Sequence, residues 1–220
     1  SDIGYYYAED VDANGNPTTQ PLPAGLLIRA SENFNRVLAF GYNSTPRTIK
    51  MTDPAGNIYR FAYAGEMLAS ITFPDSKVRT YVYNEPAHTG GANLPSALTG
   101  IVDENGDRFA TFQYDSQQRS TLTEHAGGAL RYTFSYATGS TNVTSPLGAV
   151  RTYNFQNTLG AFKNTGITGP ACPECGAASQ TFDANGNVSS RTDWNGNRTN
   201  YTYDLTRNLE AGVVLLRAAA

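Results

Sequence analysis

Residues 53–83 read DPAGNIYRFAYAGEMLASITFPDSKVRTYVY, and this stretch decides the fold. It contains two aromatic pairs, Phe61/Tyr63 and Tyr81/Tyr83, in which the rings stand two positions apart. Side chains two positions apart lie on the same face of a β-strand. Turn-forming Pro-Ala-Gly-Asn and Pro-Asp-Ser segments separate the apolar runs. The stretch therefore predicts strand, turn and strand, repeated.

The same pair spacing recurs along the chain at nearly even intervals. Successive pairs begin 21, 20, 31, 22, 19 and 48 residues apart, which is one repeat of about 20 residues with insertions. The pairs are Phe40/Tyr42, Phe61/Tyr63, Tyr81/Tyr83, Phe112/Tyr114, Phe134/Tyr136, Tyr153/Phe155 and Tyr201/Tyr203. This period predicts an all-β repeat fold of antiparallel β-hairpins in one strongly twisted, spiralling sheet, with the paired rings packed on an inner face.

The composition agrees with a strand-rich protein. Fourteen Tyr stand beside one Trp and two Met among 220 residues, and Tyr suits a pleated, half-buried surface. The net charge of −3 argues against a nucleic-acid binder, and no apolar run is long enough to span a membrane. The chain does not begin with Met and shows no signal peptide, so we interpret it as an excised or processed piece.

Turn and loop segments rich in Gly, Pro and Asn divide the chain into five parts. We expect strands near 47–53, 58–64, 67–73, 78–83, 97–103, 108–114, 121–124, 130–136, 141–145, 150–155 and 201–204. The parts are a degenerate N-terminal repeat or cap (1–32), repeats (33–156) with a surface loop at 85–95, an insertion (157–178), further repeats (179–208) and an apolar tail (209–220). The tail is compatible with a helix or an edge strand.

Asp-x-x-Gly turns connect many of these strands. Two close copies, Asp-x-Asn-Gly-Asn, stand at 183–187 and 193–197, and a degenerate copy stands at 12–16. Asp side chains cap such turns by accepting backbone N–H groups, which explains the carboxylates without calcium.

These motifs together resemble the RHS/YD repeat of bacterial Rhs proteins and of the related shells of Tc toxins and teneurins. The resemblance is carried by residues 53–63, 74–83, 106–115 and 148–153, and best by 182–204, and it covers roughly 34–209. It implies a sheet that spirals into a hollow shell enclosing a polymorphic toxin in bacterial competition. This chain has too few repeats to close a shell alone, and it shows no counterpart of the family's autocleavage segment.

The resemblance also sets expectations about partners and compartment. We expect the chain to contact the remaining RHS repeats or another copy through its open sheet edges, and an enclosed toxin domain. It implies a secreted or cell-surface bacterial protein. We expect no cofactor.

Cys172-Pro173-Glu174-Cys175-Gly176 is the sharpest local motif, because its turn geometry is that of a zinc knuckle. A structural zinc site needs four ligands, and these are the two Cys of the chain, so zinc requires further ligands from another chain. A disulfide and two plain thiols are the alternatives.

We expect no catalytic residues. His88 and His125 fall in different repeats without a partner for acid–base chemistry in the sequence, so a hydrolase built on them is the weakest hypothesis. The favoured function is a non-enzymatic segment of a shell wall. The alternative is a surface module that binds glycan or protein, with exposed aromatic rings as the contact surface.

Overall fold

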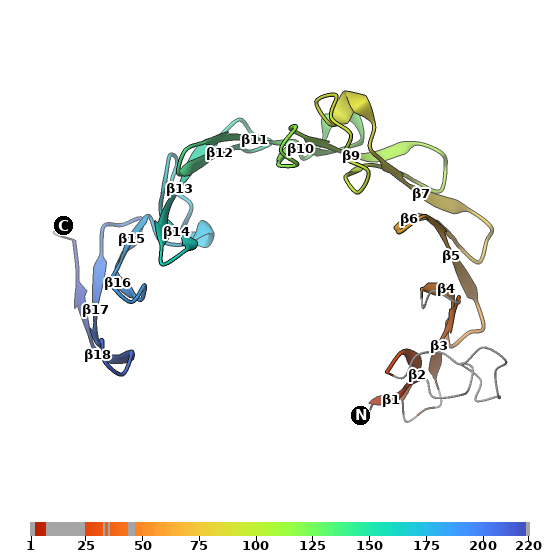
Figure 1. Cartoon of the computed structure of the whole chain (residues 1–220), viewed down its shortest axis with the longest axis horizontal. Helices are drawn as coiled ribbons and strands as arrows, with labels where there is room; N and C mark the ends of the chain where they lie inside the picture. The colour runs from red at the N-terminus through yellow and green to blue at the C-terminus, as the bar shows by residue number, and fades with distance from the viewer. Residues whose placement is uncertain (1–2, 8–24, 33, 35, 44–46, 219–220) are drawn as a thin grey trace. The chain divides into compact units, whose positions relative to one another are not determined.

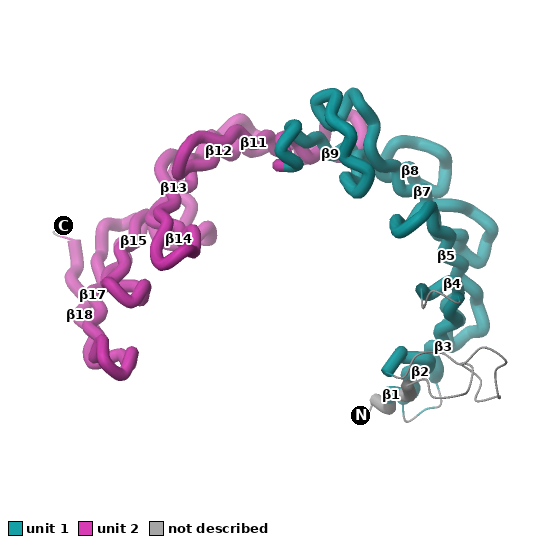
Figure 2. The backbone as a smooth tube through the Cα atoms, in the orientation of Figure 1, with its two compact units in different colours: residues 1–118 teal, residues 119–220 magenta. Residues whose placement is uncertain are grey.

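A computed structural model describes residues 3–7, 25–32, 34, 36–43 and 47–218 of the chain. The chain divides into two compact units, Ser1–Gln118 and Arg119–Ala220, which are coloured separately in Figure 2. Both units are antiparallel sheets in which each strand pairs with the next along the chain, as Figure 1 shows. The all-β, consecutive-hairpin fold is therefore confirmed. The degenerate turn at 12–16 lies outside the described residues.

The described residues of unit 1 form nine strands and one short 3-10 helix. The strands are β1 (Ile3–Tyr7), β2 (Leu27–Glu32), β3 (Val37–Tyr42), β4 (Thr48–Thr52), β5 (Ile58–Ala64), β6 (Met67–Thr72), β7 (Val78–Tyr83), β8 (Leu98–Val102) and β9 (Arg108–Tyr114). The 3-10 helix η1 (Pro86–His88) lies in the loop between β7 and β8.

Unit 2 holds the other nine strands and two 3-10 helices. The strands are β10 (Ser120–His125), β11 (Tyr132–Ala137), β12 (Ser140–Thr144), β13 (Val150–Thr158), β14 (Ala161–Thr168), β15 (Ser179–Phe182), β16 (Val188–Thr192), β17 (Arg198–Asp204) and β18 (Leu209–Leu216). The helices are η2 (Ala126–Gly128) and η3 (Pro173–Cys175). The apolar tail, which the sequence leaves open, forms strand β18.

The Asp-x-x-Gly turns hold themselves together through the aspartate side chain. In the turn between β4 and β5, Asp53 Oδ1 accepts the backbone N–H groups of Ala55 and Asn57, each at 2.9 Å. The Asn57 amide donates to Asp53 Oδ2 at 2.9 Å, and Gly56 takes a φ of +82°, which glycine adopts without strain. The same carboxylate pattern recurs at Asp103, Asp183 and Asp193. The predicted capping of these turns is confirmed.

Each unit buries few side chains completely, because a single-layer sheet covers its side chains mainly with their neighbours on the same face. Among the described residues, the buried apolar residues are Ile28, Leu94, Ala97 and Ala110 in unit 1 and Leu122, Ile167 and Cys172 in unit 2. Most strand residues are half-buried. Neighbouring hairpins therefore supply most of the stabilising contacts. Among the described residues, no helix is long and apolar enough to cross a membrane.

Candidate functional site

All fourteen paired aromatic residues are half-buried in the sheet. The second member of a pair is tyrosine in six of the seven pairs, whereas the first member is phenylalanine in four. Only tyrosine brings a hydroxyl that can donate a hydrogen bond. This bias indicates that the hydroxyl has a role at the second position.

That role is a hydrogen bond to a backbone carbonyl in the preceding strand. The acceptor lies 15 or 16 residues earlier, at or next to the first residue of that strand. The bonds are Tyr42 to Leu27 (2.6 Å), Tyr63 to Thr48 (3.0 Å), Tyr83 to Leu68 (3.0 Å), Tyr114 to Leu98 (2.9 Å) and Tyr136 to Ser120 (2.7 Å). Each of these five hairpins is thus closed by one tyrosine of its second strand.

Four of the five acceptor carbonyls, those of Leu27, Thr48, Leu68 and Leu98, lie beside β-bulges. Between β3 and β4, Gly41 pairs with Lys50 and Tyr42 pairs with Thr48, so Ile49 is an extra residue in β4. The extra residue of a bulge is left out of the ladder of backbone hydrogen bonds. The tyrosine of the next strand therefore donates to the chain where that ladder is interrupted.

The same arrangement recurs at three other strands of unit 1. In each, the residue before the extra one pairs with an aromatic residue of the preceding strand and accepts a hydroxyl from the following strand. The extra residues are Ile28 after Leu27, Ala69 after Leu68 and Thr99 after Leu98. We call this combination of a bulge and a tyrosine the tyrosine latch.

Positions that lack the hydroxyl support this interpretation. Strand β12 has no bulge in its pairing with β11, and the aromatic residue that follows it at the donor position is Phe155. Strand β14 does have a bulge, with Thr165 as the extra residue after Asn164. The next donor position there is Phe182, and the Gln180 amide donates to the Asn164 carbonyl instead, at 2.6 Å. Tyr203 is the one second-position tyrosine for which the described residues hold no such bond.

Arginine covers two of the latch rings. The guanidinium carbon of Arg47 lies 5.5 Å from the ring centre of Tyr63, and that of Arg119 lies 4.5 Å from the ring centre of Tyr136. Each arginine directly precedes the acceptor residue in the sequence. These distances allow a cation–π interaction between each arginine and the tyrosine ring.

The hydroxyls of Tyr83 and Tyr114 are held in their protonated form. Burial raises the pKa of both phenols above its usual value, and for Tyr83 the neighbouring Tyr81 adds to the effect. Because only the protonated phenol can donate, these two latches persist into alkaline solution.

The loop between β7 and β8 is fixed by an ion pair that the sequence did not reveal. Arg108 donates to both carboxylate oxygens of Glu85, at 2.9 and 2.8 Å, and the hydroxyl of the fully buried Thr99 donates to the same carboxylate at 2.7 Å. The hydrogen bonds from Arg108 are the largest cause that lowers the pKa of Glu85 to about 2. A carboxylate so strongly held in its charged form is a poor proton acceptor for catalysis.

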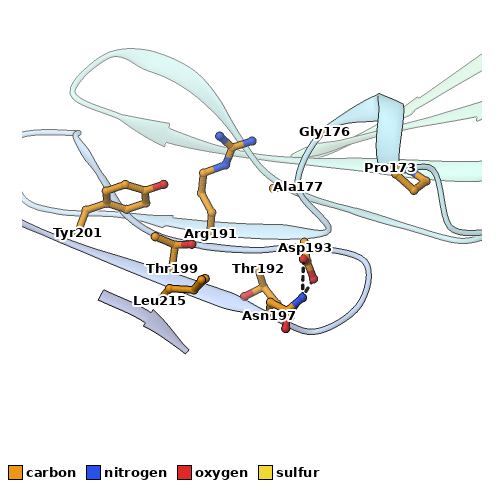
Figure 3. A pocket seen from close by; sticks show the side chains of 10 residues that line it. All are labelled: Pro173, Gly176, Ala177, Arg191, Thr192, Asp193, Asn197, Thr199, Tyr201 and Leu215. Carbon is orange, nitrogen blue, oxygen red and sulfur yellow. Dashed lines mark hydrogen bonds between the residues drawn. The ribbon is translucent and has the colours of Figure 1, made fainter. Parts of the chain in front are cut away.

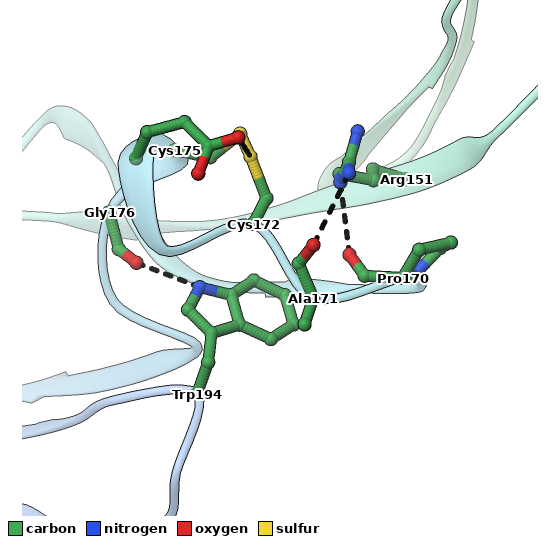
Figure 4. The surroundings of a disulfide bond; sticks show 8 residues. Arg151, Pro170, Ala171, Cys172, Cys175, Gly176 and Trp194 are labelled. Atoms are coloured by element: carbon green, nitrogen blue, oxygen red, sulfur yellow. Dashed lines mark hydrogen bonds between the residues drawn. A yellow bond between two sulfur atoms is a disulfide. The ribbon is translucent and has the colours of Figure 1, made fainter. Parts of the chain in front are cut away.

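Cys172 and Cys175 form a disulfide in the loop between β14 and β15. The indole N–H of Trp194 donates to the Gly176 carbonyl at 3.0 Å, and Arg151 donates to the Pro170 carbonyl at 3.0 Å, so both neighbouring segments tie the loop down (Figure 4). The disulfide is one of the three alternatives that the sequence leaves open. A disulfide offers no thiolate to a metal, so the zinc prediction concerns the reduced pair and stays a prediction.

The two histidines lie in different units. His88 belongs to η1 in unit 1, where Gln113 Nε2 lies 3.5 Å from His88 Nδ1. His125 ends β10 in unit 2, and its backbone N–H donates to the Ala129 carbonyl at 2.8 Å. The structure therefore places the two histidines in separate units and does not combine them in one described site.

A groove of about 310 Å³ lies in unit 2, beside the disulfide loop (Figure 3). Its lining includes Arg191, Thr199, Tyr201 and Leu215. Asp193 also faces it, but its carboxylate is engaged by its own turn through Asn197, as the dashed lines of Figure 3 show. The groove therefore presents a cation and an aromatic ring, which are groups for recognition rather than for acid–base catalysis.

No family model matches the chain, and no curated protein matches it. Solved structures do match. A crystal structure named TcdB2-TccC3-TEV matches at a TM-score of 0.56 and 14% identity, covering 89% of this chain. The Photorhabdus luminescens Tc holotoxin pore, with a mutated TccC3, matches at 0.55 and 14%, covering 93%. The fold of this chain resembles the RHS-repeat shell of the Tc toxins.

The Tc toxin structures are far longer than this chain, which spans 11% of their length in both matches. A crystal structure of TcdB2-TccC3 itself matches in the same way, at a TM-score of 0.54 and 14% identity. The RHS-type resemblance found in the aromatic pairs is thus confirmed at the level of fold. At this identity the likeness concerns the fold alone.

Proposed function

We propose that this chain is a non-enzymatic segment of the wall of an RHS-repeat shell that encloses a polymorphic toxin in bacterial competition. The observation that carries the proposal is the match of about nine tenths of the chain to a short stretch of much longer Tc toxin chains. The tyrosine hydrogen bonds support it, because one repeated contact closes five successive hairpins. Such a device builds an extended wall from local contacts.

A secreted or cell-surface location is part of the same proposal. The Cys172–Cys175 disulfide supports it, since disulfides persist in oxidising compartments. The remaining repeats of the shell and the enclosed toxin are the proposed partners.

The test is electron cryo-microscopy of the protein encoded by the complete reading frame that contains this chain. We expect a hollow shell in which residues 27–216 form consecutive hairpins of the wall. The proposal also predicts that protease digests the enclosed segment only after the shell has been opened. A solid particle, or a density in which this chain is a free arm outside any shell, would overturn the proposal.

A second candidate function, binding of glycan or protein, is favoured by the groove that contains Arg191 and Tyr201. Aromatic rings stack on sugars, and arginine binds acidic groups. The variant Arg191→Ala tests it on a glycan array, because it removes the cation without touching a latch tyrosine. Glycan binding that is present in the natural chain and lost in this variant would support the second candidate function. If the natural chain bound no glycan on the array, glycan binding would be excluded.

A further inference from the structure

Two cations stand directly opposite each other in the middle of the unit 1 sheet. Lys50 of β4 pairs with Arg60 of β5, and both side chains are exposed. Side chains directly opposite each other in an antiparallel pair lie on the same face, and like charges in this arrangement destabilise the pair. The neighbouring strands β3 and β6 flank the two cations with Gly41 and Thr72. The two cations therefore belong to the interior of the sheet and not to an open edge.

No acidic side chain of the described residues compensates these two charges. Strands β3 to β9 contain no Asp or Glu. The other two cations of these strands, Arg79 and Arg108, each pair with a glutamate, at 2.7 and 2.8 Å. The side chains of Lys50 and Arg60 make no ion pair or hydrogen bond with any described residue. Their N–H donors are therefore free for a ligand.

Arg60 lines a groove of about 350 Å³ on this part of the sheet. Thr72 and Ser76 also line the groove, and their hydroxyls make no hydrogen bond within the described part of the chain. None of the described residues that line it is an Asp or a Glu. On the other side of the pair, Gly41 has no side chain that could cover Lys50. Two cations and two free hydroxyls are thus gathered in one place without a carboxylate.

We propose that Lys50, Arg60 and the Thr72 hydroxyl form a binding site for a phosphate group. A phosphate monoester carries a charge between about −1.5 and −2 at neutral pH, which matches two cations better than a carboxylate does. The guanidinium of Arg60 presents parallel N–H donors for two phosphate oxygens, and the ammonium of Lys50 and the hydroxyl of Thr72 donate to the others. The bound phosphate also offsets the repulsion between the two cations. The inference does not depend on the proposed function, because every group in it lies within unit 1.

The test is a titration of the isotope-labelled 220-residue chain with inorganic phosphate, at constant ionic strength, followed by nuclear magnetic resonance. We expect the amide signals of β4, β5 and β6 to shift and to reach saturation. Acetate carries a single negative charge, and at the same concentration it should shift these signals far less. Phosphate that shifts no signal in these three strands would overturn the proposal. Acetate that shifts the same signals to the same extent would also overturn it.

Uncharged variants should show two effects of opposite sign. Lys50→Gln and Arg60→Gln should each weaken phosphate binding at least about ten-fold, because each removes a charged donor. Without phosphate, the urea midpoint of each variant should equal or exceed that of the natural chain, because the repulsion between like charges is gone. A lower midpoint in both variants would show that the cations serve the fold, and it would contradict the proposal.

The control for these variants is Arg191→Gln. Arg191 is also an exposed arginine that lines a groove, but it lies in unit 2. The control removes the same charge from the chain, so it should leave the phosphate affinity measured on β4, β5 and β6 within about two-fold. An equal loss of affinity in Arg60→Gln and Arg191→Gln would mean that only the net charge matters, and the site would be rejected.

Two further ligands identify the source of the phosphate group. Glycerol phosphate is a soluble monoester, and phosphatidylcholine vesicles that contain phosphatidic acid present the same group on a lipid surface. Binding of glycerol phosphate without binding of these vesicles assigns the site to a soluble phosphate compound. Sedimentation with these vesicles that requires Lys50, and that is absent with pure phosphatidylcholine, assigns it to a lipid headgroup. Binding of inorganic phosphate alone assigns it to the free ion.

Discussion

At the scale of single residues, the repeated contact of this protein is a hydrogen bond from a tyrosine hydroxyl to a backbone carbonyl. Tyr83 donates to Leu68 across the hairpin of β6 and β7, at 3.0 Å. Tyr81 stands two positions earlier on the same strand, and the described residues hold no hydrogen bond from its hydroxyl to a carbonyl. Both residues are half-buried tyrosines of strand β7, so they form a matched pair for mutation.

We predict that Tyr83→Phe lowers the free energy of unfolding by about 1 kcal/mol, because the part-buried carbonyl of Leu68 loses its donor. The control Tyr81→Phe should change it by less than about 0.5 kcal/mol. Urea denaturation followed by circular dichroism measures both. Equal effects of the two variants would show that the hydroxyl at the second position has no special role.

Glu85 gives a pH dependence with a definite sign. Its pKa lies at about 2 in the folded chain, against a reference of 4.5, chiefly because Arg108 donates to its carboxylate. A depressed pKa contributes stability that is complete above pH 4.5 and is lost as the pH falls towards 2. We predict that Glu85→Gln is less stable than the natural chain at neutral pH by about 1–2 kcal/mol and that its stability depends less on pH in this acid range.

The matched control for this prediction is Glu66→Gln. Glu66 also pairs with an arginine, Arg47, but its side chain is 82% exposed. Exposed ion pairs contribute little, so the control should differ from the natural chain by less than about 1 kcal/mol at neutral pH. Parallel loss of stability in both variants would mean that the Glu85–Arg108 pair acts as an ordinary surface pair.

At the scale of one element, the fluorescence of Trp194, the single tryptophan of the chain, reports the conformation of the loop that holds the disulfide. Trp194 donates its indole N–H to Gly176, the residue directly after Cys175. We predict that reduction of the disulfide changes the intensity and wavelength of tryptophan emission while the far-ultraviolet circular dichroism stays constant. In the variant Cys172→Ser/Cys175→Ser, reductant should have no effect on emission.

The reduced chain also tests the zinc prediction. Two thiolates and the carboxylate of Glu174 can gather their ligand atoms within 4.8 Å of one another, which is one ligand short of a structural zinc site. Zinc added to the reduced chain should therefore bind only when a second chain supplies ligands. Tight binding with a stoichiometry of one zinc per monomer would contradict that expectation.

The strands between residues 47 and 155 were predictable from sequence, whereas β1 to β3, β14 to β16, β18 and the links between strands were not. The limits of β5, β7 and β9 agree with the expected ranges, because alternation and Gly-Asn turns mark both ends of each strand. The bulges at Ile49 and Ala69 leave no mark in the sequence, since a one-residue shift in register is decided by pairing. The preference for tyrosine at the second position of each pair was the available signal for the latch.

The loop at 85–95 shows a second limit of sequence analysis. Its Gly, Pro and Asn content marks a surface loop, and many of its residues are exposed. However, Thr89 and Leu94 are buried, and Arg108 reaches Glu85 from 23 residues away. A contact between residues so far apart, with ordinary residue types on both sides, has no local pattern. Tertiary structure alone brings such groups together.

At the scale of the whole molecule, each strand depends mainly on its neighbours. A sheet of this kind gains its stability from the sum of local interfaces. We predict that Tyr63→Phe speeds amide hydrogen exchange in β4 and β5 of unit 1 and leaves exchange in β16 and β17 of unit 2 unchanged. Tyr136→Phe, which removes a latch from unit 2, is the reciprocal control. Uniform acceleration across both units would show one cooperative structure instead.

Tyrosine hydroxyls bind backbone carbonyls of the preceding strand, four of them beside β-bulges, and so fix the repeat. An experimental structure at a resolution that shows ordered side chains and carbonyl oxygens tests this most directly. We predict hydroxyl-to-carbonyl distances within hydrogen-bond range for Tyr42, Tyr63, Tyr83, Tyr114 and Tyr136, with the extra residues Ile49, Ala69 and Thr99 outside the ladder. Hydroxyls that point into solvent, over strands that pair without bulges, would contradict it.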